Sequence, residues 1–194
     1  MLNINYLFPF MDSIKNSCIL VIDMINDFIN GKFGNSNAVM AVKNARDTLK
    51  GLNGKIPVIF AKDDHIENDP EFKVWGEHAL HGTHGSEIVD ELQEYPDYII
   101  NKRHFDAFFD TDLDSLLRAL EISKLYIFGI STDICVEHTC AGAFFRYYKV
   151  EVVSDLCACI DNSRQISSLN NIKINYGYNA INSDKLKQEV FKNE

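Results

Sequence analysis

The sequence has little positive charge and no long apolar run. Its 194 residues include 19 Lys and Arg against 28 Asp and Glu, a formal net charge of −9 at pH 7. Nucleic-acid binding needs clustered Lys and Arg that neutralise phosphates, so we expect a small-molecule substrate instead. No run reaches 18 apolar residues, which argues against a membrane-spanning helix. The N-terminus lacks a basic region before its short apolar stretch, so we expect no signal peptide and a cytoplasmic protein.

The cysteines do not form the pattern of a disulfide framework. There are five, an odd number, at positions 18, 135, 140, 157 and 159. Disulfide-stapled domains are short and carry paired cysteines. Cys157 and Cys159 make a C-x-C pair, but without a second pair this is a weak signal for a metal or redox site. We therefore expect most of these thiols to pack as small apolar side chains.

Apolar runs alternate with helical patterns along the chain, which is typical of βαβ units. The sequence predicts a single α/β domain over 1–194, a three-layer α-β-α sandwich with a six-stranded, mainly parallel sheet, preceded by an apolar arm at 1–11. Strands are expected near 18–23, 56–61, 97–101, 124–129, 149–154 and 179–182. Helices are expected near 36–51, 85–92, 111–121, 135–147, 163–171 and 184–191. Residues 62–84 lack a clear period and are predicted to be a functional loop.

Cys135 follows a buried-strand run that turns through small polar residues into an apolar helix. A thiol at a helix N-terminus meets unpaired backbone N–H groups and the positive end of the helix dipole, which favour thiolate and can stabilise an oxyanion. The alternative is an inert buried thiol. Asp23 closes the strand at 18–22 and Lys102 follows another short strand. Because the C-terminal ends of parallel strands meet at one edge, the three side chains could converge. We expect Thr132 and Asp133 to cap the helix.

The loop at 62–84 holds a second group of candidate residues: Asp63, His65, Glu71 and His78. Asp63 and His65 are two apart, so on an extended strand their side chains point the same way. Imidazole and carboxylate ligands suit Zn²⁺, Mn²⁺ or Fe²⁺. The alternative is a hydrophilic surface loop whose histidines simply titrate.

Five ordered segments resemble the motifs of the isochorismatase-like cysteine hydrolases. This superfamily includes nicotinamidases, N-carbamoylsarcosine amidases, ureidoacrylate amidohydrolases and isochorismatases, and the resemblance runs from about residue 18 to 183. The segments are Asp23-x-x-Asn26-Asp27-Phe28, Lys62-Asp63-Asp64-His65 and the longer stretches 75–83, 102–111 and 129–139, which begin with Trp75, Lys102 and Gly129.

The resemblance implies a role for each matching position. Cys135 matches the nucleophile, Asp23 the acid/base and Lys102 the third member of the catalytic triad. The backbone N–H groups of Ser131 and Cys135 match the oxyanion hole, and the peptide bond before Ser131 is similar to one that the family holds cis. Positions lining the family's substrate pocket match Phe28, Trp75 and Phe105, for which ordinary core packing is the alternative.

The resemblance also implies a divalent metal, zinc before iron or manganese, and a homo-oligomer. Asp63, His65 and His78 match three ligands of the nicotinamidase metal, and Glu71 has the spacing of a fourth. Isochorismatases do not use this metal, so the implied activity is a metal-assisted cysteine amidohydrolase that cleaves a small amide, most simply nicotinamide, through a thioester.

Departures from the nicotinamidase pattern keep other substrates open. The segment from Trp75 to Ala79 is similar to that of N-carbamoylsarcosine amidases, and Asn26 stands where Gln is frequent. The alternatives are therefore an N-carbamoylsarcosine amidase or a ureidoacrylate-type amidohydrolase and, in a different class, an isochorismatase or a non-catalytic family member.

Overall fold

The sheet is parallel throughout and supports every other part of the molecule. A computed structural model describes residues 16–192; the predicted arm at 1–11 lies outside them. The strands are β1 (Ser17–Ile22), β2 (Val58–Asp63), β3 (Tyr98–Lys102), β4 (Lys124–Gly129), β5 (Lys149–Val153) and β6 (Asn179–Ile181). Their order is β3-β2-β1-β4-β5-β6. This is the doubly wound order, and the predicted α/β fold is confirmed.

The central strands are apolar because both faces of the sheet are covered. All six residues of β1 are buried, and in β4 only Lys124 is partly exposed. A strand covered on both faces reads as a continuous hydrophobic run and not as an alternating one. This explains why the positions of β1 and β4 could be predicted to within about one residue.

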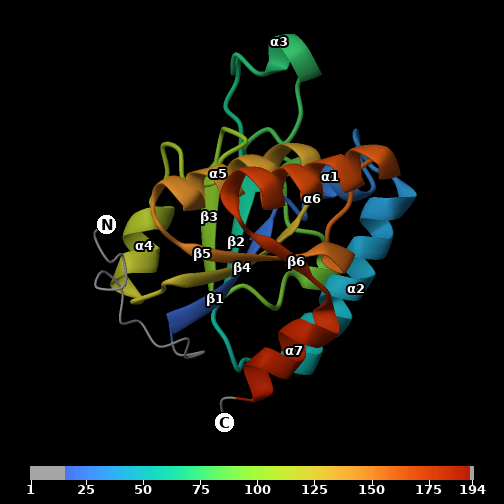
Figure 1. Ribbon diagram of the computed structural model, residues 1–194. Helices are drawn as coiled ribbons and strands as arrows, with labels where there is room; N and C mark the ends of the chain where they lie inside the picture. The colour runs from blue at the N-terminus through green and yellow to red at the C-terminus, as the bar shows by residue number, and fades with distance from the viewer. Residues whose placement is uncertain (1–15, 193–194) are drawn as a thin grey trace.

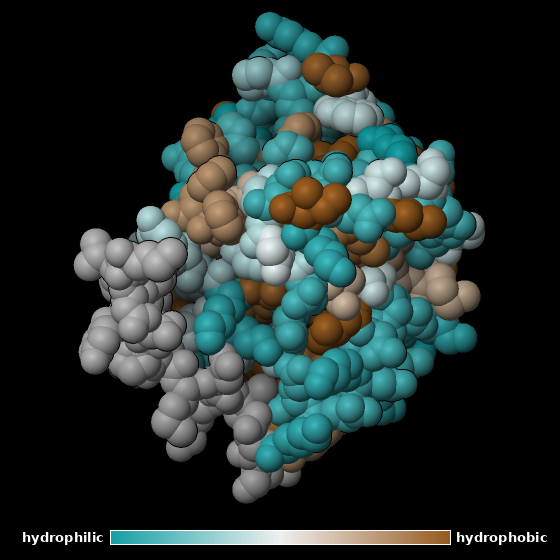
Figure 2. Space-filling model, viewed as in Figure 1, coloured by the Kyte–Doolittle hydropathy of each residue, from teal (hydrophilic) through white to brown (hydrophobic). Residues whose placement is uncertain are grey.

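Helices cover both faces of the sheet. They are α1 (Asn26–Ile29), α2 (Ser36–Leu52), α3 (Phe72–Trp75), α4 (Leu113–Ala119), α5 (Glu137–Phe145), α6 (Asn162–Tyr176) and α7 (Ser183–Phe191). Helices α2 and α7 pack together on one face, and α5 and α6 pack together on the other (Figure 1). The outward surfaces of α2 and α7 are largely hydrophilic (Figure 2), as expected of amphipathic helices. Within residues 16–192 no helix has the length and apolar character needed to cross a membrane.

The helix predicted at 85–92 is wrong. Two short 3₁₀ turns, His84–Ser86 and Asp90–Leu92, occur there instead. Between them the chain runs extended beside the end of β1: the Asn26 N–H donates to Glu87 O, and the Val89 N–H donates to Met24 O. These lateral hydrogen bonds occupy backbone groups that a helix would need.

Residues 64–84 leave the sheet after β2 and return before β3; we call them the excursion. It carries α3 and stands away from the body at the end of the sheet where the strands finish (Figure 1). The predicted functional loop therefore lies at the edge where doubly wound folds bind their ligands.

Gly129 lets β1 and β4 approach closely at that same edge. Its φ is +144°, and a Cβ atom built there would lie 1.9 Å from Ile22 O. No side chain can be accommodated at such a distance, so glycine is required. The turn after β4 is thereby brought against the residue that follows β1.

Candidate active site

Four chemically active side chains meet at the carboxyl edge of the sheet. Asp23 follows β1, Asp63 ends β2, Lys102 ends β3, and Cys135 lies in the turn after β4. Asp63 and Lys102 are register partners on neighbouring strands. All four residues are buried. The structure therefore brings together the three residues that the sequence placed at separate strand ends.

Lys102 lies between two carboxylates. Its Nζ is 2.7 Å from Asp23 Oδ2 and 2.5 Å from Asp63 Oδ1. The Asp63 backbone N–H also donates to Asp23 Oδ1 at 2.7 Å. One oxygen each of Asp23 and Asp63 and the Cys135 sulfur lie within 4.8 Å of one another. The ammonium thus balances the carboxylate that is within reach of the thiol.

Burial and charge set the protonation states of this group. Burial, with the Asp63 carboxylate, raises the pKa of Asp23 to about 6 against the opposing effect of Lys102. Burial also raises the pKa of the Cys135 thiol well above its usual value, and the Lys102 ammonium only partly offsets this. The thiolate expected from the helix N-terminus is therefore not the resting form. At neutral pH an ionised Asp23 faces a protonated thiol, the arrangement of a general base and its nucleophile.

The nucleophile turn is helical three residues earlier than predicted. A turn of π-helix, η5 (Thr132–Val136), contains Cys135 and leads directly into α5. The peptide bond between Ile130 and Ser131 is cis, as the family resemblance implied. The predicted helix caps are wrong, since η5 has no side-chain cap. Thr132 instead donates from Oγ1 to Gln165 Oε1 at 2.5 Å, and Asp133 has other partners described below.

A largely apolar cavity opens onto Cys135. Its volume is about 100 Å³, near the size that takes a single small ring. The three predicted pocket residues all line it, as do Ser131 and three of the four candidate metal ligands, whereas Asp23 and Lys102 are buried and do not line it. Residues of the wall are Phe28, Phe33, Asn35, Asp63, Glu71, Trp75, His78, Phe105, Ile130, Ser131, Asp133, Ile134, Cys135, Ala158, Cys159, Ile160 and Arg164.

The four candidate metal ligands converge beside this cavity. One donor atom from each of Asp63, His65, Glu71 and His78 lies within 4.8 Å of the others. His65 Nε2 is 3.7 Å from Asp63 Oδ2, and His78 Nε2 is 3.6 Å from Glu71 Oε1. Ligands about 2.1 Å from one ion lie about 3.4 Å apart, so these separations suit a shared cation.

Both imidazoles are oriented with Nε2 toward the other ligands. His65 Nδ1 is 2.9 Å from Asp69 Oδ2, and His78 Nδ1 is 2.8 Å from Gly76 O. These acceptors place the ring proton on Nδ1 and leave a lone pair on Nε2. His65 Nε2 is buried and has no hydrogen-bond partner among residues 16–192. A metal ion would satisfy this atom, and histidine ligands are usually held in this way by a second acceptor.

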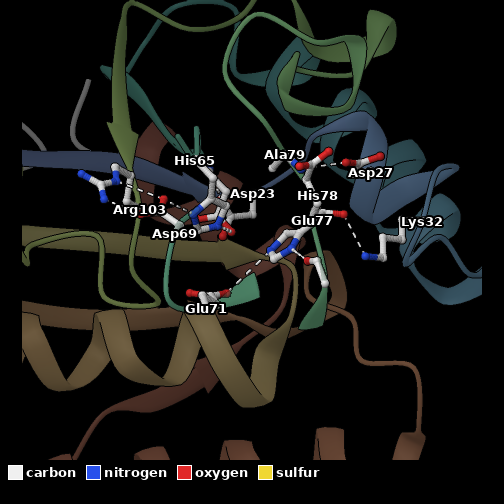
Figure 3. Close-up of polar contacts among 12 residues, drawn as sticks. Asp23, Asp27, Lys32, His65, Asp69, Glu71, Glu77, His78, Ala79 and Arg103 are labelled. Atoms are coloured by element: carbon white, nitrogen blue, oxygen red, sulfur yellow. Dashed lines mark hydrogen bonds and ion pairs between the residues drawn. The ribbon is translucent and has the colours of Figure 1, made fainter. Parts of the chain in front are cut away.

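Sequence reasoning missed the residues that support the ligands. The Asp69 carboxylate is held by Arg103, from the segment after β3, in an arrangement that no spacing rule reveals. On the other side, Asp27 Oδ2 accepts from the Ala79 N–H at 2.7 Å, and the Lys32 ammonium donates to Glu77 O at 2.8 Å. Figure 3 shows these contacts flanking the two histidines. The excursion is thus tied to the body on both sides of its ligands.

Comparison with known proteins places the chain in a family. The model of the Isochorismatase domain matches residues 17–184. The chain belongs to the isochorismatase family. Membership of this family makes it a hydrolase, while leaving its substrate open.

Relatives in the isochorismatase family carry several activities. The chain is 27% identical to nicotinamidase 3 of Arabidopsis thaliana over 92% of its own length and 91% of that protein's. A probable inactive nicotinamidase of the same plant is 33% identical, over 74% and 81% of the two lengths. The crystal structure of N-carbamoylsarcosine amidase from Thermoplasma acidophilum is 34% identical with a TM-score of 0.80, covering 87% of this chain and 97% of the other.

Proposed function

We propose that this hydrolase is a metal-assisted cysteine amidohydrolase that cleaves a small amide to a carboxylate and ammonia, with nicotinamide as the leading substrate. The observation that carries the proposal is the juxtaposition, at one cavity, of the Cys135 thiol with the Asp23 and Lys102 pair and with four converging metal-type ligands. A nucleophile with its base and a separate anchoring point for the substrate are what hydrolysis of a small amide requires.

The first step uses the protonation states described above. Asp23 accepts the thiol proton as Cys135 Sγ attacks the carbonyl carbon, and Lys102 balances the negative charge of the pair. The carbonyl electron pair moves onto oxygen, which the backbone N–H groups of Ser131 and Cys135, the positions that match the family's oxyanion hole, would stabilise. Asp23 then returns the proton to the departing nitrogen, so the C–N bond breaks with release of ammonia.

The second step repeats the same proton transfer with water. Asp23 takes a proton from a water molecule, whose oxygen attacks the thioester carbon. The C–S bond then breaks and the proton returns to sulfur, which restores the thiol. Each proton moves between Asp23 and a neighbouring atom, so no further acid or base is needed.

A divalent ion held by Asp63, His65, Glu71 and His78 fits the donor set, since the Nε2 lone pairs and two carboxylates are the ligands that zinc, iron and manganese accept. When bound, it would act as a Lewis acid that anchors a lone pair of the substrate, such as a ring nitrogen. The aromatic residues Phe28, Phe33 and Trp75 would then enclose the ring.

An N-carbamoylsarcosine amidase is the second candidate, favoured by the 34% identity to the solved enzyme of that activity. The two candidates share the nucleophile and differ in what fills the cavity. A flat ring uses the aromatic wall, whereas a short carbamoyl substrate does not need it.

Ammonia release from a panel of amides tests the proposal. The purified protein, loaded with Zn²⁺ and in separate assays with Mn²⁺ or Fe²⁺, is incubated with nicotinamide, N-carbamoylsarcosine and ureidoacrylate. Isochorismate is assayed alongside by its own product. We expect turnover of nicotinamide first and none of isochorismate. Hydrolysis of isochorismate alone, or of nothing on the panel, would reject the amidohydrolase.

Matched cysteine variants identify the nucleophile. Cys135→Ala should abolish ammonia release. Cys140→Ala removes another buried thiol, five residues further along the same helical segment but not on the cavity wall, and should retain activity. Retained activity in the first variant would show that another group attacks the amide.

A further inference from the structure

Asp133 lies two residues before the nucleophile but makes none of the expected cap interactions. Its Oδ1 accepts from Ser131 Oγ at 2.5 Å and from Cys159 Sγ at 3.1 Å. Its Oδ2 forms an ion pair with the Arg164 guanidinium. Burial acts to raise the pKa of Asp133, but the hydrogen bonds from Ser131 and Cys159 and the charge of Arg164 keep it below its usual value. The carboxylate is thus an anion that binds the side chain of the oxyanion-hole residue.

Helix α6 supplies the outer half of this contact. Arg164 pairs with Asp133, and the next residue, Gln165, accepts from Thr132 Oγ1. One turn further along, Ser168 donates to Thr132 O at 2.9 Å. Three polar side chains of α6 therefore hold Thr132 and Asp133, the two residues that follow Ser131.

This contact does not involve the proposed proton-transfer groups. Asp23 and Lys102 come from strand ends and do not line the cavity, whereas Asp133 and Arg164 lie on the cavity wall. A change at Arg164 therefore leaves the ion pair that activates the thiol intact, and acts on the backbone that would face the oxyanion.

We propose that the Asp133–Arg164 ion pair is a positioning device that holds the Ser131 peptide in the orientation needed to stabilise the oxyanion. The inference rests on the proposed function. Removing Arg164 frees Asp133 to turn toward solvent, and Ser131 Oγ then loses its fixed acceptor. An oxyanion hole depends on donors fixed in advance at about 2.7–3.1 Å from the developing charge, so a small rotation of this peptide weakens it.

Two probes separate the oxyanion hole from the thiol. An aldehyde forms a thiohemiacetal: Sγ bonds to the aldehyde carbon, the carbonyl pair moves onto oxygen, and the thiol proton passes to Asp23. Its affinity depends on the oxyanion donors. Alkylation of Cys135 by iodoacetamide breaks a C–I bond, generates no oxyanion, and reports only on the thiol. Pyridine-3-carbaldehyde serves as the first aldehyde, and propanal as a smaller one.

We expect Arg164→Gln to bind both aldehydes about tenfold more weakly than the wild type, and to lose kcat for amide hydrolysis by a similar factor with little change in KM. The loss is smaller than the 10²–10³-fold that follows complete removal of an oxyanion-hole donor. The rate of Cys135 alkylation should stay unchanged. Arg164→Lys, which keeps the charge, should recover most of the affinity.

Arg118→Gln is the matched control, because Arg118 is also an exposed, ion-paired arginine, with its side chain 63% exposed against 54% for Arg164, and does not line the cavity. Unchanged aldehyde affinity in Arg164→Gln would overturn the inference. So would a rise in KM alone, which would make Arg164 a substrate contact, or an equal fall in alkylation rate, which would place the effect on the thiol.

Failure of the proposed function is distinguishable. If the wild type hydrolyses no amide but binds an aldehyde, the proposed function fails, whereas the variants still test the positioning role. If no aldehyde adds to the wild type, the oxyanion hole is absent and the inference fails with it.

Discussion

The two halves of the site are held in different ways. At the sheet edge, Asp23 and Lys102 are fixed by parallel strands, and the ammonium balances the carboxylates inside the protein. In the excursion, Glu71 and His78 lie on irregular chain, and the Nε2 atom of the neighbouring His65 has no partner among the described residues. The chemistry of the sheet edge is therefore arranged by the fold, whereas the excursion half presents ligand-type atoms that a bound cation would satisfy. Asp63 belongs to both halves, with one oxygen toward Lys102 and the other toward His65.

The largest effect is expected at the sheet edge. Asp23→Asn keeps the shape of the side chain but removes the base, so kcat should fall by about 10²–10⁴-fold. Steady-state ammonia release measures it. Asp97→Asn, which changes an exposed acceptor far from the cavity, should retain full activity. A loss of less than about tenfold in Asp23→Asn would mean that another group takes the thiol proton.

Lys102→Met tests whether the charged group at the sheet edge also contributes to the stability of the fold. Removing the ammonium leaves two buried carboxylates without their partner, and breaking a buried ion pair in this way costs about 3–5 kcal/mol. Urea unfolding should show this loss. His78→Gln, measured without added metal, should cost much less, because its ring contacts aromatic side chains and does not balance a buried charge. Equal losses of unfolding free energy in the two variants would show that the two halves of the site do not differ in their contribution to stability.

The sheet-edge half could be predicted from the sequence, because a parallel sheet converts chain position into spatial position. Asp23 follows the buried apolar run of β1 and Lys102 ends the short apolar run of β3, and the ends of parallel strands meet at one edge. The same rule predicted all six strands. It also predicted Cys135 there, but the favoured thiolate was wrong, because no local pattern reveals how deeply the thiol is buried, and burial is the main cause of its raised pKa.

The supporting contacts could not be predicted. Arg103 reaches Asp69 across 34 positions, and Arg164 reaches Asp133 across 31. No periodic pattern in the sequence links charged residues so far apart. Each of them could equally well be an ordinary solvent-exposed side chain. The expected caps at Thr132 and Asp133 were wrong for this reason, since both side chains bond to other segments, with α6 supplying a partner for each. In the excursion, the sequence revealed which residue types could bind a metal but not how they are arranged. Their arrangement depends on contacts with α1 and with the segment after β3.

Asp69→Asn examines the excursion half with a smaller change. The carboxylate that orients His65 loses its charge and its pairing with Arg103, so affinity for Zn²⁺ should fall by about 10–100-fold. Isothermal titration calorimetry measures this without any substrate. Asp64→Asn alters the neighbouring carboxylate, which pairs with Lys62 and His81 instead, and should bind zinc as the wild type does. Equal affinity in Asp69→Asn would mean that His65 needs no orienting partner.

The pH dependence should separate activity from stability. Only ionised Asp23 can accept the thiol proton, and its pKa is raised from 3.8 to about 6 by burial and by Asp63. Below about pH 6, kcat/KM should therefore fall about tenfold per pH unit, and above it should level off. If kcat/KM instead begins to fall only near pH 4, the pKa of Asp23 is not raised by its surroundings.

The contribution of Asp23 to the free energy of unfolding should fall as the pH rises, whereas kcat/KM should increase. A carboxyl group with a raised pKa binds its proton more tightly in the folded state than in the unfolded chain. The stabilisation that this gives is complete below about pH 4 and is lost as the pH rises through about 6. Asp23→Asn does not titrate, so the difference in unfolding free energy between it and the wild type should change over this interval and stay constant above it. The pH that activates the base therefore also removes part of the stability of the sheet edge.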